Sequence, residues 1–245
     1  MSRQEEFDRL FDEGYLDVYA PRQKDDEEAA AEALAAARLA GCEPGAAILD
    51  CPCGFGRHSI ALARDGYRVV GADRSQALLD EARRRAGDAE LELVQADYRE
   101  LPLPDDCFDA VLNLFTSIGY TGREGDTQGL REFRRVLKPG GKLVVETMQR
   151  DRLARIFQPR GWERLPDGYL LEERSFDLVE SVIRTTITYL PDEGEPREYP
   201  YALRLYTATE LVEMAREAGF DTVDCYGGYE QEELTLDSRL VMLAS

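Results

Sequence analysis

Short apolar runs alternate with amphipathic segments through the middle of the chain. Runs rich in apolar and β-branched residues predict strands at residues 46–50, 67–73, 91–97, 107–115 and 141–147. Apolar residues at helical spacing between these runs predict helices at residues 57–65, 75–86 and 125–138. Because strands that alternate with helices need crossover connections, the pattern predicts a parallel sheet with helices on both faces.

The segments on either side of this region have different patterns. Residues 25–41 are rich in Ala and Leu behind an acidic start, which predicts a helix that ends at Gly41. Residues 161–206 instead show the alternation of strands, with a turn signal at residues 192–196. This part of the chain is therefore expected to form an antiparallel insertion.

The C-terminal segment returns to the earlier pattern. Thr207 and Glu210 match a capping box at the start of a helix over residues 207–219, and strands are expected at 220–227 and 239–244. The predicted fold is α/β: a doubly wound, mostly parallel seven-stranded sheet with an antiparallel β insertion after the fifth strand. We expect four parts: a helical leader or lid (1–41), a core (42–150), an antiparallel lid insertion (151–206), and a C-terminal helix with two strands that complete the core (207–245).

The charge of the chain excludes some partners. The 245 residues carry a formal net charge of −19, and the excess acid lies before residue 37 and after residue 162. A nucleic acid or an anionic membrane surface would be repelled by much of this protein, so neither is an expected partner. The acidic flanks could attract a cationic partner instead.

The cysteines and the N-terminus bear on the compartment. Five cysteines are an odd number and do not suggest a disulfide scaffold, so reduced thiols and a cytoplasmic location are expected. The first 14 residues lack an apolar signal core, and no run of about 18 apolar residues occurs. We therefore expect no membrane span.

The segment LDCPCGFGRHS carries the strongest chemical signal in the sequence. A strand ends at Asp50, and Gly54 and Gly56 follow before the next helix. Glycines at the carboxyl end of such a strand let the backbone approach a ligand, and the helix start favours a negative group. The next two strands also end in acids, Asp73 and Asp97, and Asp73 lies where a nucleotide-binding sheet holds ribose hydroxyls.

Other interpretations of this loop fit less well. A plain tight turn explains the two glycines but not three successive strands that end in Asp. A dehydrogenase fingerprint would require Gly or Ala where Ser59 stands, and no P-loop motif occurs. A metal site is not expected, because the CxC cysteines lack a partner pair and His58 is the single histidine.

As a set, five segments resemble the class I S-adenosylmethionine-dependent methyltransferases. They are LDCPCGFGRHSIALA, VVGADRSQALLDEAR, VQADYRELP, FDAVLNLFTSIGY and REFRRVLKPGGKLVVE, which span about residues 46–147 in the family order. YTATELVEMAREAGF also resembles the penultimate helix of that family. The resemblance implies a Rossmann-like fold, S-adenosyl-L-methionine as the cofactor, and S-adenosyl-L-homocysteine as the product.

The resemblance also implies roles for individual residues. The loop would lie along the methionine part, Asp73 and Arg74 would hold the ribose and flank the adenine, and Asp97 would accept from the adenine amino group. In the leader, Tyr19 would cover the cofactor and Arg22 would approach its carboxylate. The full implied cofactor set is Tyr19, Arg22, Asp50, Cys51, Pro52, Cys53, Gly54, Gly56, Asp73, Arg74, Asp97, Tyr98, Asn113, Leu114 and Phe115.

The acceptor is expected to be a small molecule, most plausibly one with an amine. Removing the proton of a hydroxyl acceptor commonly needs a His or a metal, and His58 is expected to pack locally. An amine needs only to lose one proton and be aligned, and an acidic, aromatic cover would attract a cationic acceptor. Phe115 and Tyr120 are candidates for the acceptor site, and Tyr15, Tyr120 and Tyr206 are candidates for orienting the acceptor.

These expectations match methyltransferases that tailor amines in secondary metabolism, which is again a resemblance. O- or C-methylation of a small molecule remains an alternative. So does a non-catalytic module that only binds S-adenosylmethionine.

Overall fold

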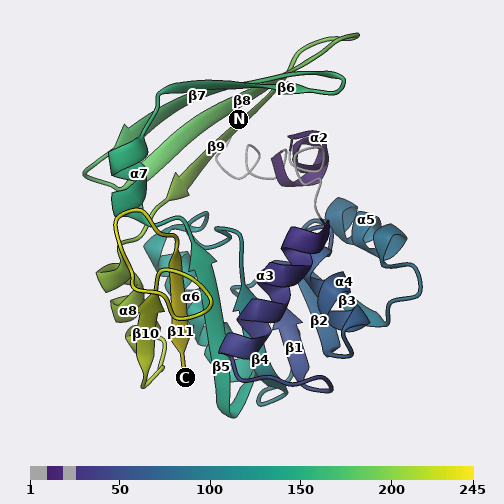
Figure 1. The fold of residues 1–245 in the computed structure, drawn as a ribbon, viewed down its shortest axis with the longest axis vertical. Coiled ribbons are helices and arrows are strands. Elements are labelled where there is room, and N and C mark those ends of the chain that lie inside the picture. Colours follow the sequence, from purple (N-terminus) through teal and green to yellow (C-terminus); the bar gives the residue numbers. More distant parts are fainter. Residues whose placement is uncertain (1–9, 19–25) are drawn as a thin grey trace.

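A computed structural model describes residues 10–18 and 26–245 and contains a seven-stranded sheet (Figure 1). Its strands lie in the order β10-β11-β5-β4-β1-β2-β3, and β1 to β5 pair in parallel, whereas β11 is antiparallel to both of its neighbours. The bounds are Ala47–Asp50 (β1), Arg68–Asp73 (β2), Leu91–Gln95 (β3), Phe108–Asn113 (β4), Leu137–Thr147 (β5), Val223–Tyr226 (β10) and Leu240–Ala244 (β11). The predicted fold class is confirmed, and the strand order reverses between β1 and β4.

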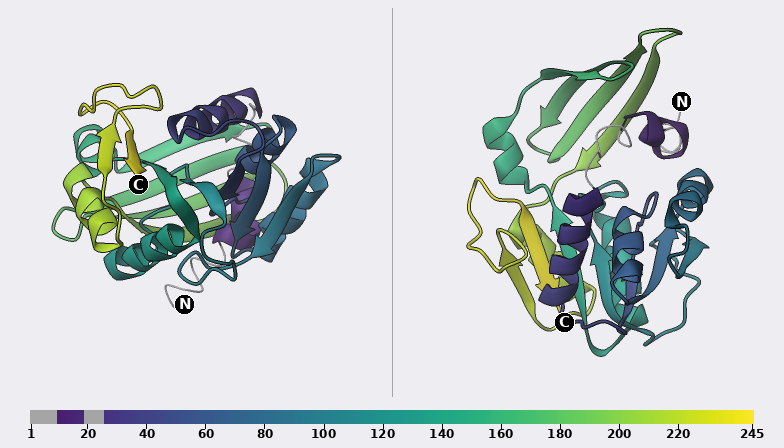
Figure 2. Two further views of the ribbon diagram at one scale, coloured as in Figure 1. Left: turned by 90° about the horizontal axis from the view of Figure 1, so that it is seen from below. Right: turned by 45° about the vertical axis from the view of Figure 1, so that its right-hand side comes forward.

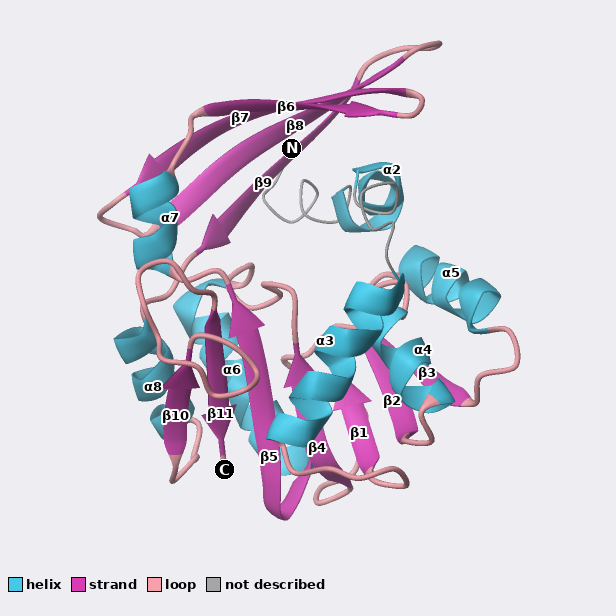
Figure 3. Ribbon diagram, viewed as in Figure 1, coloured by secondary structure: helices cyan, strands magenta, loops and turns pink. Residues whose placement is uncertain are grey.

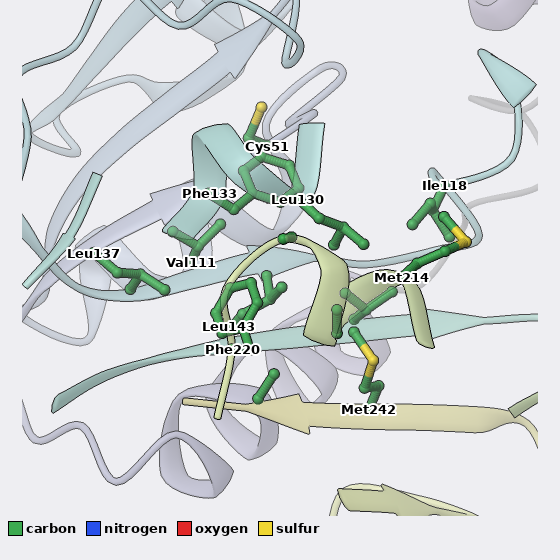
Figure 4. Packing of buried hydrophobic residues seen from close by; sticks show 14 of the residues in the cluster. Cys51, Val111, Ile118, Leu130, Phe133, Leu137, Leu143, Met214, Phe220 and Met242 are labelled. Atoms are coloured by element: carbon green, nitrogen blue, oxygen red, sulfur yellow. The ribbon is translucent and has the colours of Figure 1, made fainter. Parts of the chain in front are cut away.

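Helices cover both faces of this sheet (Figure 3). One face packs on α3 (Asp26–Leu39) and α4 (Arg57–Arg64), and the other on α6 (Gly122–Val136) and α8 (Ala208–Glu217). Adjacent residues of one strand enter opposite layers, so Ile48 joins the α3 side and Leu49 the α6 side. Figure 4 shows the α6 side of this core, where Met214 and Met242 lie beside Leu143 and Phe220.

A second, antiparallel sheet stands over the carboxyl ends of the parallel strands (Figures 1 and 2). It follows α7 (Arg150–Ile156) and contains β6 (Arg160–Leu165), β7 (Gly168–Asp177), β8 (Val182–Pro191) and β9 (Arg197–Arg204). The leader forms a π-helical turn, η1 (Leu10–Gly14), and α2 (Tyr15–Val18), which lie between the two sheets. Leu10 and Val18 are buried there against Leu170 and Tyr199 of the antiparallel sheet.

Several element boundaries differ from the sequence prediction. The helix expected at residues 125–138 begins at Gly122 and ends at Val136, because Leu137 already pairs with Phe108 in the sheet. α7 and β6 were not predicted as separate elements. The predicted caps are present: Ser75 Oγ accepts from the Leu78 N–H at the start of α5 (Gln76–Ala86), and Thr207 with Glu210 forms a capping box.

Among residues 10–18 and 26–245, none of the helices combines the length and the apolar character that a bilayer crossing requires.

Candidate active site

A pocket opens between the carboxyl ends of the parallel strands and the leader. It contains about 850 Å³ of empty space, part of it open to solvent. Most of the described site residues expected from the sequence line it together: Tyr15, Cys51, Pro52, Cys53, Gly54, Asp73, Arg74, Asp97, Tyr98, Leu114, Phe115 and Tyr120. Tyr19 and Arg22 lie outside the described residues.

The loop after β1 presents bare backbone to this pocket. The Cys53 N–H donates to the Ala72 carbonyl at 2.9 Å and ties the loop to β2. Gly54 has a φ of 55°, lines the pocket, and would direct a Cβ into open space. Gly56 serves a different purpose, because a Cβ there would lie 3.0 Å from the Ala82 side chain of α5. The first glycine therefore faces the ligand space and the second allows close helix packing.

Asp73 lies at the end of β2 with its carboxylate buried in the pocket wall. Its two oxygens accept the Gly54 N–H at 2.8 Å and the Ser75 N–H at 2.9 Å. Burial raises the pKa of Asp73 to about 6, although these two hydrogen bonds act in the opposite direction. A carboxylate has about four acceptor sites, so two remain for donors from a ligand.

The third strand-end acid, Asp97, is held differently. Arg99 donates to it from its backbone at 2.9 Å and from its guanidinium at 2.5 Å. Burial alone would raise the pKa of Asp97, but these bonds from Arg99 outweigh it and lower the pKa. The neighbouring Tyr98 also lines the pocket, and its hydroxyl donates to Asp126 at 2.6 Å and lies 2.7 Å from the Thr121 hydroxyl.

Asp50, Gly56 and Asn113 do not line the pocket but support its loop. Asp50 is buried and accepts from the Ser59 hydroxyl at 2.5 Å, and burial raises its pKa. Asn113 donates to the Cys51 carbonyl at 2.9 Å, while its own amide oxygen is buried without a hydrogen-bond partner. Burial also raises the pKa of the Cys51 thiol well above its ordinary value, which favours packing over thiolate chemistry.

Aromatic side chains form a further part of the pocket lining. Phe11 lies edge-on to Tyr120 with ring centres 5.0 Å apart, and Tyr15 stacks on Phe11 at 5.5 Å. Phe55 and Phe115 complete this group, which we call the aromatic end. Among the described lining residues, the carboxylates are those of Asp73 and Asp97, and neither belongs to the aromatic end.

Sequence reasoning did not identify Phe11, Phe55 or Arg57 as site residues. Phe55 stands between Gly54 and Gly56, so its place in the motif was an available signal. Arg57 follows the motif and lies over the Phe115 ring, 4.1 Å from its centre. Phe11 reaches the pocket through the packing of the leader, which no local pattern reveals.

Tyr206 is not placed in the pocket. Its side chain is buried in the α6-side core, and its hydroxyl donates to Asp126 at 2.5 Å. Burial raises the pKa of Tyr206 far above its ordinary value, and the adjacent Asp126 adds to this shift. Tyr15 and Tyr120 do line the pocket, so the structure brings together two of the three tyrosines proposed to orient the acceptor.

Comparisons with known proteins agree with this geometry. Residues 48–141 match a methyltransferase domain family. A demethylmenaquinone methyltransferase of Listeria monocytogenes is 31% identical over 201 residues, which cover 76% of this chain and 74% of that protein. The chain belongs to the S-adenosylmethionine-dependent methyltransferases. Matches to the first two curated relatives span less than half of those proteins, 45% and 42% of their lengths.

Two further methyltransferases match most of the chain. The cypemycin N-terminal methyltransferase of a Streptomyces species is 28% identical over 211 residues, 81% of this chain and 82% of that protein. The CcbJ methyltransferase of Streptomyces caelestis has a similar structure, with a TM-score of 0.80 and 25% identity, covering 93% of this chain and 94% of that one. The structural similarity to the CcbJ methyltransferase therefore extends over nearly the whole chain.

The residues of this methyltransferase fit its family cofactor, S-adenosyl-L-methionine. The two free acceptor sites of Asp73 match two adjacent ribose hydroxyls. Gly54, whose N–H donates to Asp73, leaves backbone uncovered beside them, because a Cβ there would meet nothing within 4 Å. Charge, hydrogen-bonding capacity and space at this end of the pocket all suit the cofactor.

Proposed function

We propose that this protein transfers a methyl group from S-adenosyl-L-methionine to the nitrogen of a small-molecule amine. One observation carries the proposal: Asp73 and the Gly54 loop, which we assign to the cofactor, line the same pocket as the aromatic residues, which we assign to the acceptor. When bound, the cofactor supplies a methyl group on a positively charged sulfur. The residues of the pocket then need to hold, align and desolvate the acceptor.

The aromatic end supports nitrogen as the target. Faces of Phe and Tyr rings attract a cationic or partly cationic amine, and they exclude water from it. Oxygen acceptors would need a base. The single histidine, His58, lines the pocket, but its Nε2 lies 3.6 Å from the Glu32 carboxylate, and we propose that it pairs with Glu32 instead of serving as that base. An amine that arrives as an ammonium group has only to release its proton to solvent before it is aligned.

The names of two relatives indicate two different classes of methyl acceptor. The cypemycin enzyme is named for methylation at an N-terminus, whereas the Listeria enzyme is named for demethylmenaquinone. A flat quinone ring would also stack in an aromatic pocket. Carbon methylation of such a ring is therefore the second candidate.

Calorimetric binding of S-adenosyl-L-homocysteine tests the cofactor part of the proposal. Asp73→Ala is expected to weaken binding by at least about tenfold, since it removes a buried acceptor of two hydroxyl donors. Asp88→Ala, an exposed acid beyond α5, is the matched control and should bind like the original protein. Unchanged affinity in Asp73→Ala would contradict the assignment of the cofactor end.

Product analysis tests the acceptor part. The protein is incubated with S-adenosyl-L-methionine and matched pairs of amines and alcohols that share one carbon skeleton, together with a naphthoquinone. Methylated amines are the expected products. Turnover of the quinone alone would support the second candidate and contradict nitrogen methylation.

A further inference from the structure

Phe115 and Thr116 form an unusual pair in the loop after β4. Their φ angles are 61° and 56°, in the left-handed region that bulky and β-branched side chains rarely adopt. The other non-glycine residues with positive φ in the described chain, Asp106, Ser181 and Gln231, each occur singly. Consecutive strained residues persist only where the surrounding structure holds them, and they are concentrated at functional sites.

The residue that holds both of them is Glu146, the last but one of β5. Its Oε2 accepts the Phe115 N–H at 2.8 Å, and its main-chain oxygen accepts the Thr116 N–H at 3.1 Å. The Thr116 hydroxyl in turn accepts the Met148 N–H at 3.0 Å. The strained loop is therefore fastened to the end of β5 by three hydrogen bonds.

The Glu146 carboxylate is itself fixed from behind. It is buried, and its Oε1 lies 3.6 Å from Nε of Arg239 in the loop before β11. Arg239 also donates to Glu32 of α3 at 2.6 Å. Glu146 does not line the pocket, so it can act on a ligand only through the loop that it holds.

The loop conformation decides where the Phe115 ring lies. This ring is 41% exposed, although Phe is usually buried, and it lines the pocket with Arg57 over one face. Relaxing φ of Phe115 to the ordinary negative region would swing its Cβ to another direction and withdraw the ring. The strained backbone thus places an exposed ring in the pocket lining.

We propose that Glu146 is a positioning residue that holds the Phe115 ring at the junction where cofactor and acceptor meet. That the cofactor and the acceptor meet beside this ring rests on the proposed function. That Glu146 fixes the position of the Phe115 ring does not depend on the proposed function. The hydrogen bond from the Phe115 N–H requires an acceptor oxygen at the full reach of a Glu side chain. A Gln side chain is as long as Glu and still places an oxygen at that reach. Asp keeps the negative charge, but its side chain is too short to reach the same position.

The test places 4-fluorophenylalanine at position 115 and compares Glu146→Gln with Glu146→Asp by fluorine NMR. Glu146→Gln should retain a single resonance at the original position, since its amide oxygen still accepts the N–H. Glu146→Asp should shift or broaden the resonance as the ring samples other positions. In calorimetry, Glu146→Asp should weaken S-adenosyl-L-homocysteine binding by about tenfold, and Glu146→Gln by about twofold or less.

Asp109→Ala is the matched control for loss of stability. Asp109 also accepts a backbone N–H, from Ala47 at 2.8 Å, but near the amino-terminal ends of the strands. This variant should lose stability without changing the resonance or the affinity. An unchanged resonance in Glu146→Asp, or equal changes in Asp and Gln variants, would overturn the proposal. Failure of the original protein to bind S-adenosyl-L-homocysteine would instead contradict the proposed function. The fluorine NMR comparison would still test whether Glu146 fixes the position of the Phe115 ring.

Discussion

Asp73 is buried, yet its carboxylate is surrounded by donors rather than by a cationic side chain at hydrogen-bond distance. Backbone N–H groups of Gly54 and Ser75 occupy one acceptor site on each oxygen. Burial dominates the balance and raises the pKa to about 6. The residue is therefore poised to change its charge close to neutral pH.

This pKa predicts a pH-dependent affinity for the cofactor. In the proposed complex the carboxylate would accept from four donors, the two backbone N–H groups and two ribose hydroxyls, and this requires its ionised form. A proton would therefore compete with the ligand. Affinity for S-adenosyl-L-homocysteine should fall as pH drops through about 6, approaching about tenfold per pH unit below it. Calorimetry between pH 5 and pH 8 measures this fall in affinity. The Asp73→Asn variant, whose amide does not titrate, should lose this pH dependence.

The raised pKa of Asp73 makes the free energy of unfolding depend on pH in the opposite direction to the affinity for the ligand. The folded protein, with a pKa of about 6, holds this proton more tightly than the unfolded chain, where the ordinary value is 3.8. Without ligand, the Asp73 contribution to the free energy of unfolding should therefore decrease as pH rises from about 4 to about 6. An affinity that rises on acidification would contradict the assignment of the ionised form to binding.

At the scale of elements, Asp126 of α6 joins three loops around the pocket. It is fully buried and accepts hydroxyl hydrogen bonds from Tyr98 after β3, Thr121 after β4 and Tyr206 after β9. Gly129, one turn along the helix, leaves room for the Tyr98 ring, because a Cβ there would collide with it. The pocket wall is thus tied to the end of the antiparallel sheet through one carboxyl group.

This arrangement predicts a structural role for Tyr206 instead of a catalytic one. Tyr206→Phe should lower the free energy of unfolding by about 1–2 kcal/mol, and Asp126→Ala by about 3 kcal/mol, measured by urea denaturation. Tyr206→Phe should leave S-adenosyl-L-homocysteine affinity within about twofold, because the residue does not line the pocket. Tyr169→Phe, in the exposed face of the antiparallel sheet, is the control. A large loss of cofactor affinity in Tyr206→Phe with unchanged stability would contradict this role.

The case of Tyr206 shows where prediction from sequence ends. Strand periodicity and the position of Asp50, Asp73 and Asp97 at strand ends were sufficient to predict the parallel sheet and the edge that carries the pocket. Local rules also predicted the caps at Ser75 and Thr207. They could not indicate which tyrosine of the C-terminal half turns inward, because that depends on a partner 80 residues away. The strained backbone at Phe115 has the same cause, since its support comes from β5.

At the scale of the whole molecule, the net charge of −19 and the pocket must be considered separately. The sequence suggested an acidic cover over the acceptor. In the structure the acids Asp192, Glu193 and Glu195 are exposed in the β8–β9 loop, with Asp192 paired to Arg164 at 2.8 Å. Among the described residues that line the pocket, the carboxylates are those of Asp73 and Asp97, which the proposed function assigns to the cofactor. The acids can therefore attract a cation from a distance, but contact with it would come from aromatic rings.

The two sources of amine selectivity respond differently to salt. Attraction by surface acids is screened over about 10 Å at 0.1 M salt and about 3 Å at 1 M, whereas contact with desolvated rings is screened much less. We therefore expect the preference for amines over alcohols of the same skeleton to persist at 1 M salt, even if turnover at low substrate concentration falls. Competition between the two acceptors in one reaction, at both salt concentrations, measures the preference directly. Collapse of the ratio at 1 M would assign the selectivity to the acidic surface, and a ratio near one at both concentrations would contradict amine selectivity altogether.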